Sequence, residues 1–189
     1  MSMKSTLTAI RVSVVLMLIC GLLYPLVTTG AAGVLFPKQA KGSLAQVNGT
    51  AVGSELIAQD FQSPKLFHPR ASNAKYDPTA SAGSNMMIAS PEYVKEMKEK
   101  IDALRKENPN LTDIPADLVT VSGSGFDPDL SPEAAMAQVP RISKATGISE
   151  QQLNELVDSS TKSRQLGVFG EPRVNVLEIN MELMKQLKL

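Results

Sequence analysis

The longest apolar run of the chain lies near its N-terminus. Residues 12–36 contain no charged side chain, and residues 12–23 are almost wholly apolar. A helix rises about 1.5 Å per residue, so roughly 20 residues cross a hydrocarbon core about 30 Å thick. The run therefore predicts one transmembrane helix at 12–36. Within it, Gly21 offers a neighbouring helix a place of close approach.

A cleaved signal peptide is the alternative interpretation of this run. A basic start, an apolar core and small residues between Thr29 and Ala32 fit such a peptide. Apolar residues resume at 34–36, beyond that cleavage point, which favours a retained anchor. Pro25 removes one backbone hydrogen bond near the outer end of the helix, where the hydroxyl of Thr28 or Thr29 is expected to compensate.

The pattern then changes to short strands and a long irregular segment. After a connector at 37–42, apolar runs at 44–47 and 50–52 flank Asn48-Gly49, which predicts a hairpin because both residues tolerate positive φ. From 53 to 85, aromatic residues, prolines and single polar groups follow neither a helical nor a strand period. This composition is typical of an ordered loop whose side chains fix its shape or contact a partner.

A charged amphipathic helix is predicted next. Ser90 is a typical N-cap and Pro91 suits the first helical position. One face repeats apolar residues at helical spacing, namely Val94, Met97, Ile101 and Leu104. The charges of the other faces predict a solvated surface rather than a binding patch. Residues 118–121 alternate enough to predict a short strand.

The C-terminal third is predicted to be mainly helical. Residues 132–146 fit a helix with a kink or break at Pro140, and Ser149 starts a capping box for another helix. A last helix is predicted from Asn175. A strand at 174–179 stays open as the alternative, because that stretch is rich in β-branched residues.

The charges orient the predicted anchor. Lys4 and Arg11 are the only charged residues upstream of it, and both are positive, which predicts a cytoplasmic N-terminus at 1–11. Residues 37–189 then form a single extracytoplasmic domain of ordinary size. The expected fold class is α+β, with one N-terminal transmembrane helix followed by this domain.

Composition narrows the possible partners and chemistry. The chain has 19 acidic and 19 basic side chains, and without Lys4 and Arg11 the outer part is slightly acidic. This balance argues against nucleic acid as a partner, because phosphate binding requires a basic patch. The one cysteine, Cys20, lies within the predicted anchor, so no disulfide is expected in the outer domain.

The residues give no sign of an active site. His68 is the only histidine and has no metal-binding or nucleophilic companion at a recognisable spacing. Residues 122–125 read Ser-Gly-Ser-Gly, which matches neither a nucleophile elbow nor a phosphate-binding loop. Residues 127–129 read Asp-Pro-Asp, but the later ligands of a calcium loop are missing. No catalytic, cofactor-binding or metal-binding residue is therefore predicted.

Several stretches, in fixed order and spacing, carry a resemblance to a known family. They read Leu23-Tyr24-Pro25-Leu26-Val27-Thr28-Thr29, Gly53-Ser54-Glu55-Leu56-Ile57, Phe67-His68-Pro69-Arg70-Ala71-Ser72, Tyr76-Asp77-Pro78, Ser81-Ala82-Gly83-Ser84-Asn85, Val119 to Pro128, Val139-Pro140-Arg141-Ile142 and Gly170 to Glu178. With them the chain resembles, nearly end to end, the KdpC family, the C subunit of the Kdp potassium-transporting P-type ATPase. Departures at Ala58, Pro69 and Ala71 affect local loop geometry only.

The resemblance implies a non-catalytic accessory subunit of a high-affinity, ATP-driven potassium uptake pump in the bacterial cytoplasmic membrane. Its partners would be a channel-like potassium-binding subunit, a P-type subunit in which ATP and Mg act, and membrane lipid. Two roles are proposed in the family: assembly of the complex with cover of the outer potassium entrance, and a catalytic chaperone that raises ATP affinity. The predicted topology favours the first, because ATP is cytoplasmic.

Nine residues are candidate subunit contacts: Gly21, Phe67, His68, Arg70, Tyr76, Ser84, Asn85, Glu171 and Arg173. Internal packing of their loops is the alternative interpretation. If Arg70 lies at an interface, Arg70→Ala is expected to weaken co-purification and leave melting unchanged. The rival function is a membrane-anchored extracytoplasmic ligand-binding protein or hydrolase, which would need a pocket with convergent polar groups.

Overall fold

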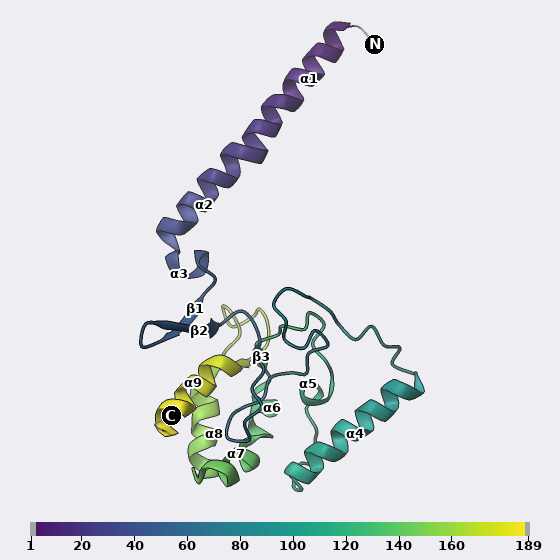
Figure 1. The fold of residues 1–189 in the computed structure, drawn as a ribbon, viewed down its shortest axis with the longest axis vertical. Helices are drawn as coiled ribbons and strands as arrows, with labels where there is room; N and C mark the ends of the chain where they lie inside the picture. The colour runs from purple at the N-terminus through teal and green to yellow at the C-terminus, as the bar shows by residue number, and fades with distance from the viewer. Residues whose placement is uncertain (1–2, 188–189) are drawn as a thin grey trace. The chain divides into compact units, whose positions relative to one another are not determined.

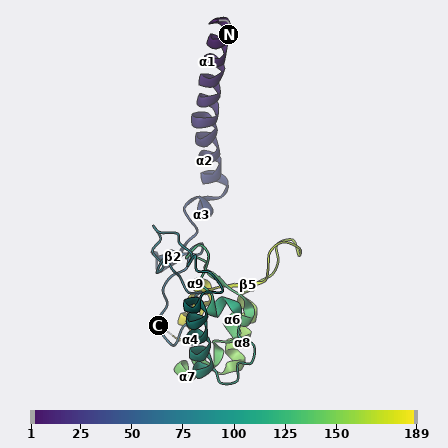
Figure 2. The same ribbon diagram turned by 90° about the vertical axis from the view of Figure 1, so that its right-hand side faces the viewer.

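The computed structural model describes residues 3–187 and contains two compact units, Met1–Leu44 and Ala45–Leu189 (Figures 1 and 2). The first is helical and the second mixes helices with short strands. The α+β fold class and the long N-terminal apolar helix expected from the sequence are confirmed.

The N-terminal unit is one continuous helix of 33 residues, Met3–Leu35, long and apolar enough to cross a membrane. It comprises α1 (Met3–Leu18), the π-helical segment η1 (Ile19–Leu23) and α2 (Tyr24–Leu35). The short helix α3 (Pro37–Ala40) follows. None of the helix's most apolar window is buried against the described chain. This surface thus lacks the protein cover that a core helix of a soluble protein has.

The π-helical segment explains how the helix accommodates Pro25. Tyr24 donates its N–H to the carbonyl of Ile19, five residues back, so the turn preceding the proline is wider than in an α-helix. A proline ring in a regular helix clashes with the carbonyl four residues back, here Gly21. The Thr28 hydroxyl bonds the carbonyls of Tyr24 (2.8 Å) and Pro25 (3.1 Å). The wider turn, rather than a threonine hydroxyl, therefore accommodates Pro25. The Thr28 hydroxyl bonds only carbonyls of its own turn.

The second unit begins with the predicted hairpin. Strands β1 (Leu44–Val47) and β2 (Thr50–Ser54) pair, and Asn48 (φ 50°) and Gly49 (φ 80°) form the left-handed turn. Residues 55–90 then contain no helix and no strand beyond a single bridge between Ala71 and Val121. This is the ordered irregular segment that the sequence predicts.

A small antiparallel sheet and the C-terminal helices form the core. The sheet order is β3 (Asp129–Leu130), β5 (Arg173–Asn175) and β4 (Thr161–Lys162). The helices that follow these strands in the chain are α6 (Pro132–Met136), α7 (Val139–Thr146), α8 (Glu150–Ser160) and α9 (Val176–Leu187). Buried apolar side chains of these helices, of the sheet and of the irregular segment pack as one cluster, which includes Phe67, Leu130, Ile142, Leu153, Val174, Ile179 and Leu183.

Three buried or half-buried polar side chains attach the irregular segment to this core. The amide of Asn180 accepts the N–H of Phe67 and donates to its carbonyl, both at 2.8 Å. Gln138 does the same for His68, accepting its N–H at 2.8 Å and donating to its carbonyl at 3.1 Å. Arg141 donates to the carbonyls of residues 64 and 66. The backbone of the segment therefore bonds side chains of α7, of its N-cap residue Gln138 and of α9, because buried peptide groups need hydrogen-bond partners.

The charged helix α4 (Pro91–Glu107) starts as predicted, with the Ser90 hydroxyl accepting the N–H of Tyr93. The capping box of α8 at Ser149 and Gln152 is also confirmed. α4 buries no residue fully in the described structure. It lies on the periphery of the second unit, next to α5 (Figure 1).

The strand predicted at 118–121 is wrong. Residues Ala116–Val119 form the short helix α5, and only Val121 makes a bridge. Pro115 precedes the helix, and the carboxylate of Asp117 accepts the N–H (2.7 Å) and hydroxyl (3.2 Å) of Ser131. These contacts outweigh the weak alternation of apolar residues, as tertiary context often does for short runs.

Two other boundaries differ from the predictions. The helix at 132–146 breaks after Met136 rather than at Pro140, which occupies the first turn of α7. Met136 is the residue four before the proline, whose ring an unbroken helix could not accommodate there. At the C-terminus both readings hold in part: the strand ends at Asn175 and the helix starts at Val176. The Asn175 side chain accepts the N–H of Glu178, as an N-cap does.

Candidate subunit-contact site

Three of the predicted contact residues meet at one charged hollow. Arg70 comes from the irregular segment, while Glu171 and Arg173 precede and enter β5. They line a hollow of about 310 Å³ together with Asp117, Asp127, Asp129, Leu130, Ser131 and Pro172. The tertiary structure therefore brings together charges that lie about 100 positions apart in the chain.

Two ion pairs join residues that line this hollow. Arg70 Nη1 lies 2.8 Å from Asp127 Oδ2, and Arg173 Nε lies 3.0 Å from Asp129 Oδ2. Partial burial raises the pKa of the Asp129 carboxyl, and the nearby Arg173 guanidinium opposes that rise. The other two carboxylates of the hollow have partners of their own: Asp117 accepts from Ser131, and Glu171 pairs with Arg164, which lies outside the hollow.

The internal ion pair of Arg70 changes the expectation for its replacement. Arg70 also donates to the Thr120 hydroxyl at 3.4 Å, and its side chain is only 24% exposed. Arg70→Ala would therefore remove internal contacts as well as any contact with a partner. The variant is therefore expected to melt at a lower temperature whether or not Arg70 contacts a partner. It does not distinguish a subunit contact from an internal structural role.

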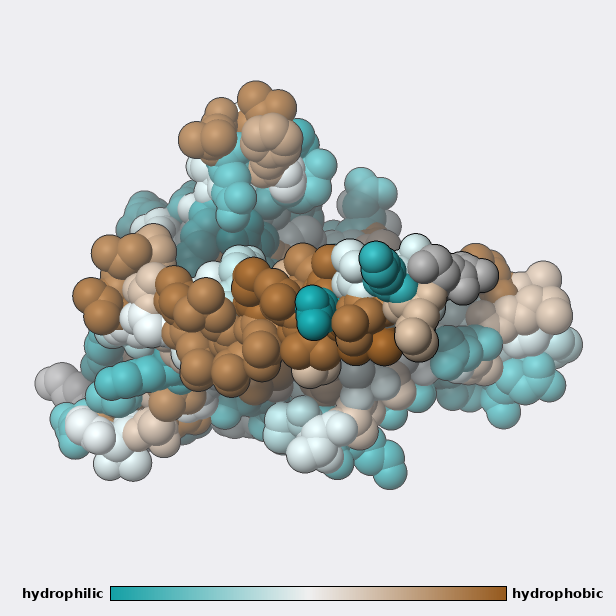
Figure 3. All heavy atoms as spheres, turned by 90° about the horizontal axis from the view of Figure 1, so that it is seen from above, coloured by the Kyte–Doolittle hydropathy of each residue, from teal (hydrophilic) through white to brown (hydrophobic). Residues whose placement is uncertain are grey.

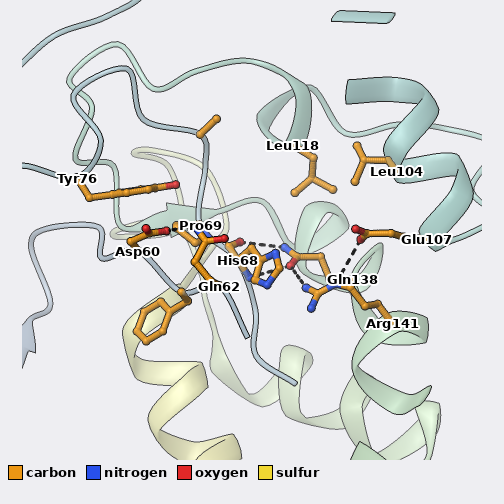
Figure 4. A pocket seen from close by; sticks show the side chains of 12 residues that line it. Asp60, Gln62, His68, Pro69, Tyr76, Leu104, Glu107, Leu118, Gln138 and Arg141 are labelled. Carbon is orange, nitrogen blue, oxygen red and sulfur yellow. Dashed lines mark hydrogen bonds and ion pairs between the residues drawn. The ribbon is translucent and has the colours of Figure 1, made fainter. Parts of the chain in front are cut away.

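His68 and Tyr76 line a second hollow, of about 240 Å³, shown in Figure 4. His68 Nε2 lies 3.0 Å from the carbonyl of Ser63, which can only accept, so Nε2 carries the proton. Burial, and secondarily the Arg141 guanidinium, lowers the pKa of His68 below its ordinary 6.5. The Tyr76 hydroxyl donates to the Arg70 carbonyl at 2.9 Å, and burial raises its pKa to about 12. Both side chains have internal structural partners.

Arg141 lies at one side of this second hollow, between Gln138 and Glu107 (Figure 4). Besides its two bonds to the irregular segment, it donates to Gln138 Oε1 at 2.7 Å and lies 3.4 Å from Glu107 of α4. Reasoning from sequence assigned no role to Arg141, Gln138 or Asn180. Single polar residues on amphipathic helices look like solvated positions, and no local pattern marks their distant backbone partners.

The remaining predicted contacts lie elsewhere. The Phe67 side chain is fully buried in the core cluster, so it presents no surface to a partner in this structure. Ser84 and Asn85 lie in the irregular segment, where Asn85 has φ 52° and is exposed. Gly21 lies in η1, and a Cβ added there would meet nothing within 4 Å.

The loop at 122–125 is a structural turn. The Ser122 hydroxyl, in a residue only 2% exposed, accepts the N–H groups of Gly125 at 3.1 Å and Asp127 at 3.4 Å. Such bonds hold the hydroxyl away from solvent and from any base. Within residues 3–187, no group of three or more His, Cys, Asp or Glu side chains is placed to hold a metal ion.

Comparison with known proteins gives a match over almost the whole chain. The family model of KdpC, described as K+-transporting ATPase, c chain, matches residues 6–185. A potassium-transporting ATPase KdpC subunit of Caldanaerobacter subterraneus subsp. tengcongensis is 47% identical over 181 residues, covering 95% of this chain and 94% of the relative. One from Rhodopseudomonas palustris (strain BisB5) is 47% identical, with 96% of each covered, and one from Clostridioides difficile (strain 630) is 42% identical, with 99% and 100% covered.

Proposed function

Since this chain belongs to the KdpC family of K+-transporting ATPase subunits, we propose that it assembles and stabilises a high-affinity, ATP-driven potassium uptake pump. As a member of this family it is a non-catalytic subunit. The end-to-end family match is the observation that carries the proposal. The long uncovered helix supports it, because an accessory subunit needs a surface for its partners.

The apolar helix supplies the first proposed contact. In lipid, helices associate by close packing at small residues, since lipid tails are as apolar as the helix surface. Gly21 has open space around its Cα, and the wider turn of η1 at this point locally changes the helix surface. We assign this stretch to packing against membrane helices of the partner subunits, with the remaining face toward lipid.

The charged hollow supplies the second proposed contact. Arg70 is paired with Asp127, and the pairing of β3 with β5 places Asp129 beside Arg173. These charged side chains are therefore held in fixed positions before a partner binds. Preformed complementary charges fix the register of two partners and exclude wrong ones. We assign this surface to the channel-like potassium-binding subunit, outside the membrane.

The side of the membrane on which the domain lies bears on whether the chain can act as a catalytic chaperone. Lys4 and Arg11 lie in the N-terminal part of the helix, before its uncharged stretch, and this bias favours a cytoplasmic N-terminus and an extracytoplasmic domain. ATP and Mg would then act in the P-type partner on the opposite side of the membrane. We therefore favour assembly and contact at the outer face over a direct effect on ATP binding.

A detergent pull-down tests the proposal. The full chain, tagged at its C-terminus, is recovered from bacterial cells starved of potassium. Recovery of a large P-type ATPase subunit and a channel-like subunit supports the proposed function. Recovery of a folded chain alone would overturn it and favour a free-standing anchored ligand-binding protein or hydrolase.

A further inference from the structure

An exposed arm projects from the second unit between β4 and β5. We define the arm as residues 163–172, every one of which is exposed. Figure 2 shows it extending away from the body of the unit. Its tip carries Leu166 (90% exposed), Val168 (69%) and Phe169 (64%), and stands out as an apolar patch at the top of Figure 3.

The arm is an ordered hairpin. The N–H of Gln165 donates to the carbonyl of Phe169 at 2.8 Å, and the N–H of Phe169 returns the bond at 2.9 Å. Arg164 and Glu171 form an ion pair across the stem. Leu166 (φ 53°) and Gly167 (φ 76°) both take the left-handed conformation at the tip. Specific pairing therefore displays the apolar side chains in a fixed place.

Leu166 is an unfavourable residue for its own turn. The other hairpin of the chain has nearly the same angles at Asn48 (φ 50°) and Gly49 (φ 80°), with the residues that such turns prefer. A branched apolar side chain is strained in the left-handed region, where Asn is tolerated. Leu166 is also almost fully exposed, so burial in its own domain does not offset this strain. The side chain is best explained by a contact outside the domain.

We propose that the tip of the arm inserts into an apolar recess on the extramembrane surface of another subunit of the same pump. This rests on the proposed function, and it identifies the element that makes the contact. The base of the arm is continuous with the charged hollow, because Glu171 and Arg173 line that hollow. The arm would thus add an apolar anchor beside a polar contact surface, as in interfaces with a buried core and a polar rim.

The charges of the arm favour a protein over a lipid surface. Elements that bind anionic lipid headgroups use unpaired Lys and Arg, often with Trp or Tyr. Here Arg164 is paired with Glu171 and Arg173 with Asp129, and residues 165–170 carry no charge. Such an arm has little electrostatic attraction to a membrane.

The area of the tip argues against a second copy of this chain. Even if each of the three apolar side chains buried as much as a large aromatic one, about 250 Å², the tip would bury at most about 750 Å², and Leu and Val bury less. A stable free-standing interface needs about 800 Å² per partner. A small anchor is sufficient where other contacts already hold both partners in one membrane, because the local concentration is then high.

The test uses the full chain in its native membranes. A photocrosslinking amino acid replaces Phe169, and separately Leu56, an exposed residue (62%) outside the arm, as the control. In parallel, Leu166→Asn and Phe169→Ser are compared with Leu56→Asn in the detergent pull-down. Leu166→Asn gives the tip turn the preferred residue, so loss of folding is not expected from it.

A crosslink from position 169 to another pump subunit, absent from position 56, supports the proposal. Both arm variants should recover at least about fivefold less partner, with melting of the chain unchanged or raised for Leu166→Asn. Crosslinks to lipid alone or to a second copy would overturn it. So would full partner recovery by the arm variants, and the proposed function would then still stand. If the wild-type chain recovers no partner subunit, both the arm contact and the proposed function are overturned.

Discussion

At the scale of single residues, long-range polar contacts hold this domain together. Asn180 lies in a helix and Phe67 in the irregular segment, 113 positions apart, yet one amide satisfies both backbone groups of Phe67. Gln138 repeats the arrangement one residue later, at His68. These two amides replace the ladder that a neighbouring strand would provide, and so give an irregular segment a defined conformation.

Asn180→Ala should therefore be strongly destabilising. Removing the amide leaves a buried N–H and a buried carbonyl without partners, at about 1–3 kcal/mol each, so we expect a loss of about 2–6 kcal/mol in unfolding free energy. Denaturant titration of the full chain in detergent measures it. Asn154, exposed on α8, is the matched control, and Asn154→Ala should change stability by less than about 0.5 kcal/mol. Equal effects of the two variants would contradict the role given to Asn180.

His68 should make stability depend on pH. Its folded-state pKa lies below the ordinary 6.5, because burial and Arg141 disfavour the charged ring, while Glu107 and Asp60 nearby oppose this. The unfolded chain then binds the proton more readily, so stability present above pH 6.5 is lost as pH falls below it. His68→Gln, which keeps a donor toward Ser63, should show a shallower loss of melting temperature between about pH 6.5 and 5. Parallel curves for the two proteins would exclude this contribution.

At the scale of elements, local capping decides where the helices start. α8 begins at a complete capping box, in which Ser149 and Gln152 satisfy each other's backbone groups. The helix contributes three fully or nearly buried side chains to the core, namely Leu153, Leu156 and Val157. Fraying of its first turn would therefore also loosen the core.

Ser149→Ala should lower the unfolding free energy by about 1 kcal/mol, the usual effect of losing an N-cap. Asn154→Ala in the same helix should leave stability unchanged or raise it by a few tenths of a kcal/mol, because alanine is the better helix former. Denaturant midpoints of the two variants, measured side by side, check the prediction. A Ser149→Ala chain as stable as wild type would show that tertiary packing alone fixes this helix end.

At the scale of the whole molecule, the two units meet different solvents under the proposed function. The helix Met3–Leu35 is uncovered by the described chain, while the second unit has a single apolar core of its own. An apolar surface of this length is stable only in lipid or against other apolar helices. Lys4 and Arg11, at the N-terminal end of this helix, then decide on which side the domain lies.

Cysteine labelling tests that orientation. The one cysteine, Cys20, lies inside the apolar helix and should give little background. Asn154→Cys places a thiol on the exposed face of α8, and we expect a membrane-impermeant maleimide to label it in intact spheroplasts. Ser5→Cys, at the other end, should react only after lysis. The reverse pattern would place the domain in the cytoplasm and reopen a direct role at the ATP-binding subunit.

The sequence by itself determined the features that depend on neighbouring residues. The apolar run gave the N-terminal helix, Asn48-Gly49 gave the hairpin turn, and Ser90 and Ser149 gave helix starts. Each depends on a local rule: the length of an apolar run, positive φ at a turn, or a side chain that caps the next turn. The combined order of its short stretches also indicated the family.

Only the tertiary structure decided what the irregular segment does. It buried Phe67, paired Arg70 with Asp127, and formed a helix at 116–119 that overlaps the strand predicted at 118–121. It also placed Leu166 at the tip of an exposed arm. These outcomes depend on contacts between residues far apart in the chain. Such contacts leave no periodic pattern in the sequence, because each side chain's environment is set by segments that reach it only when the chain has folded.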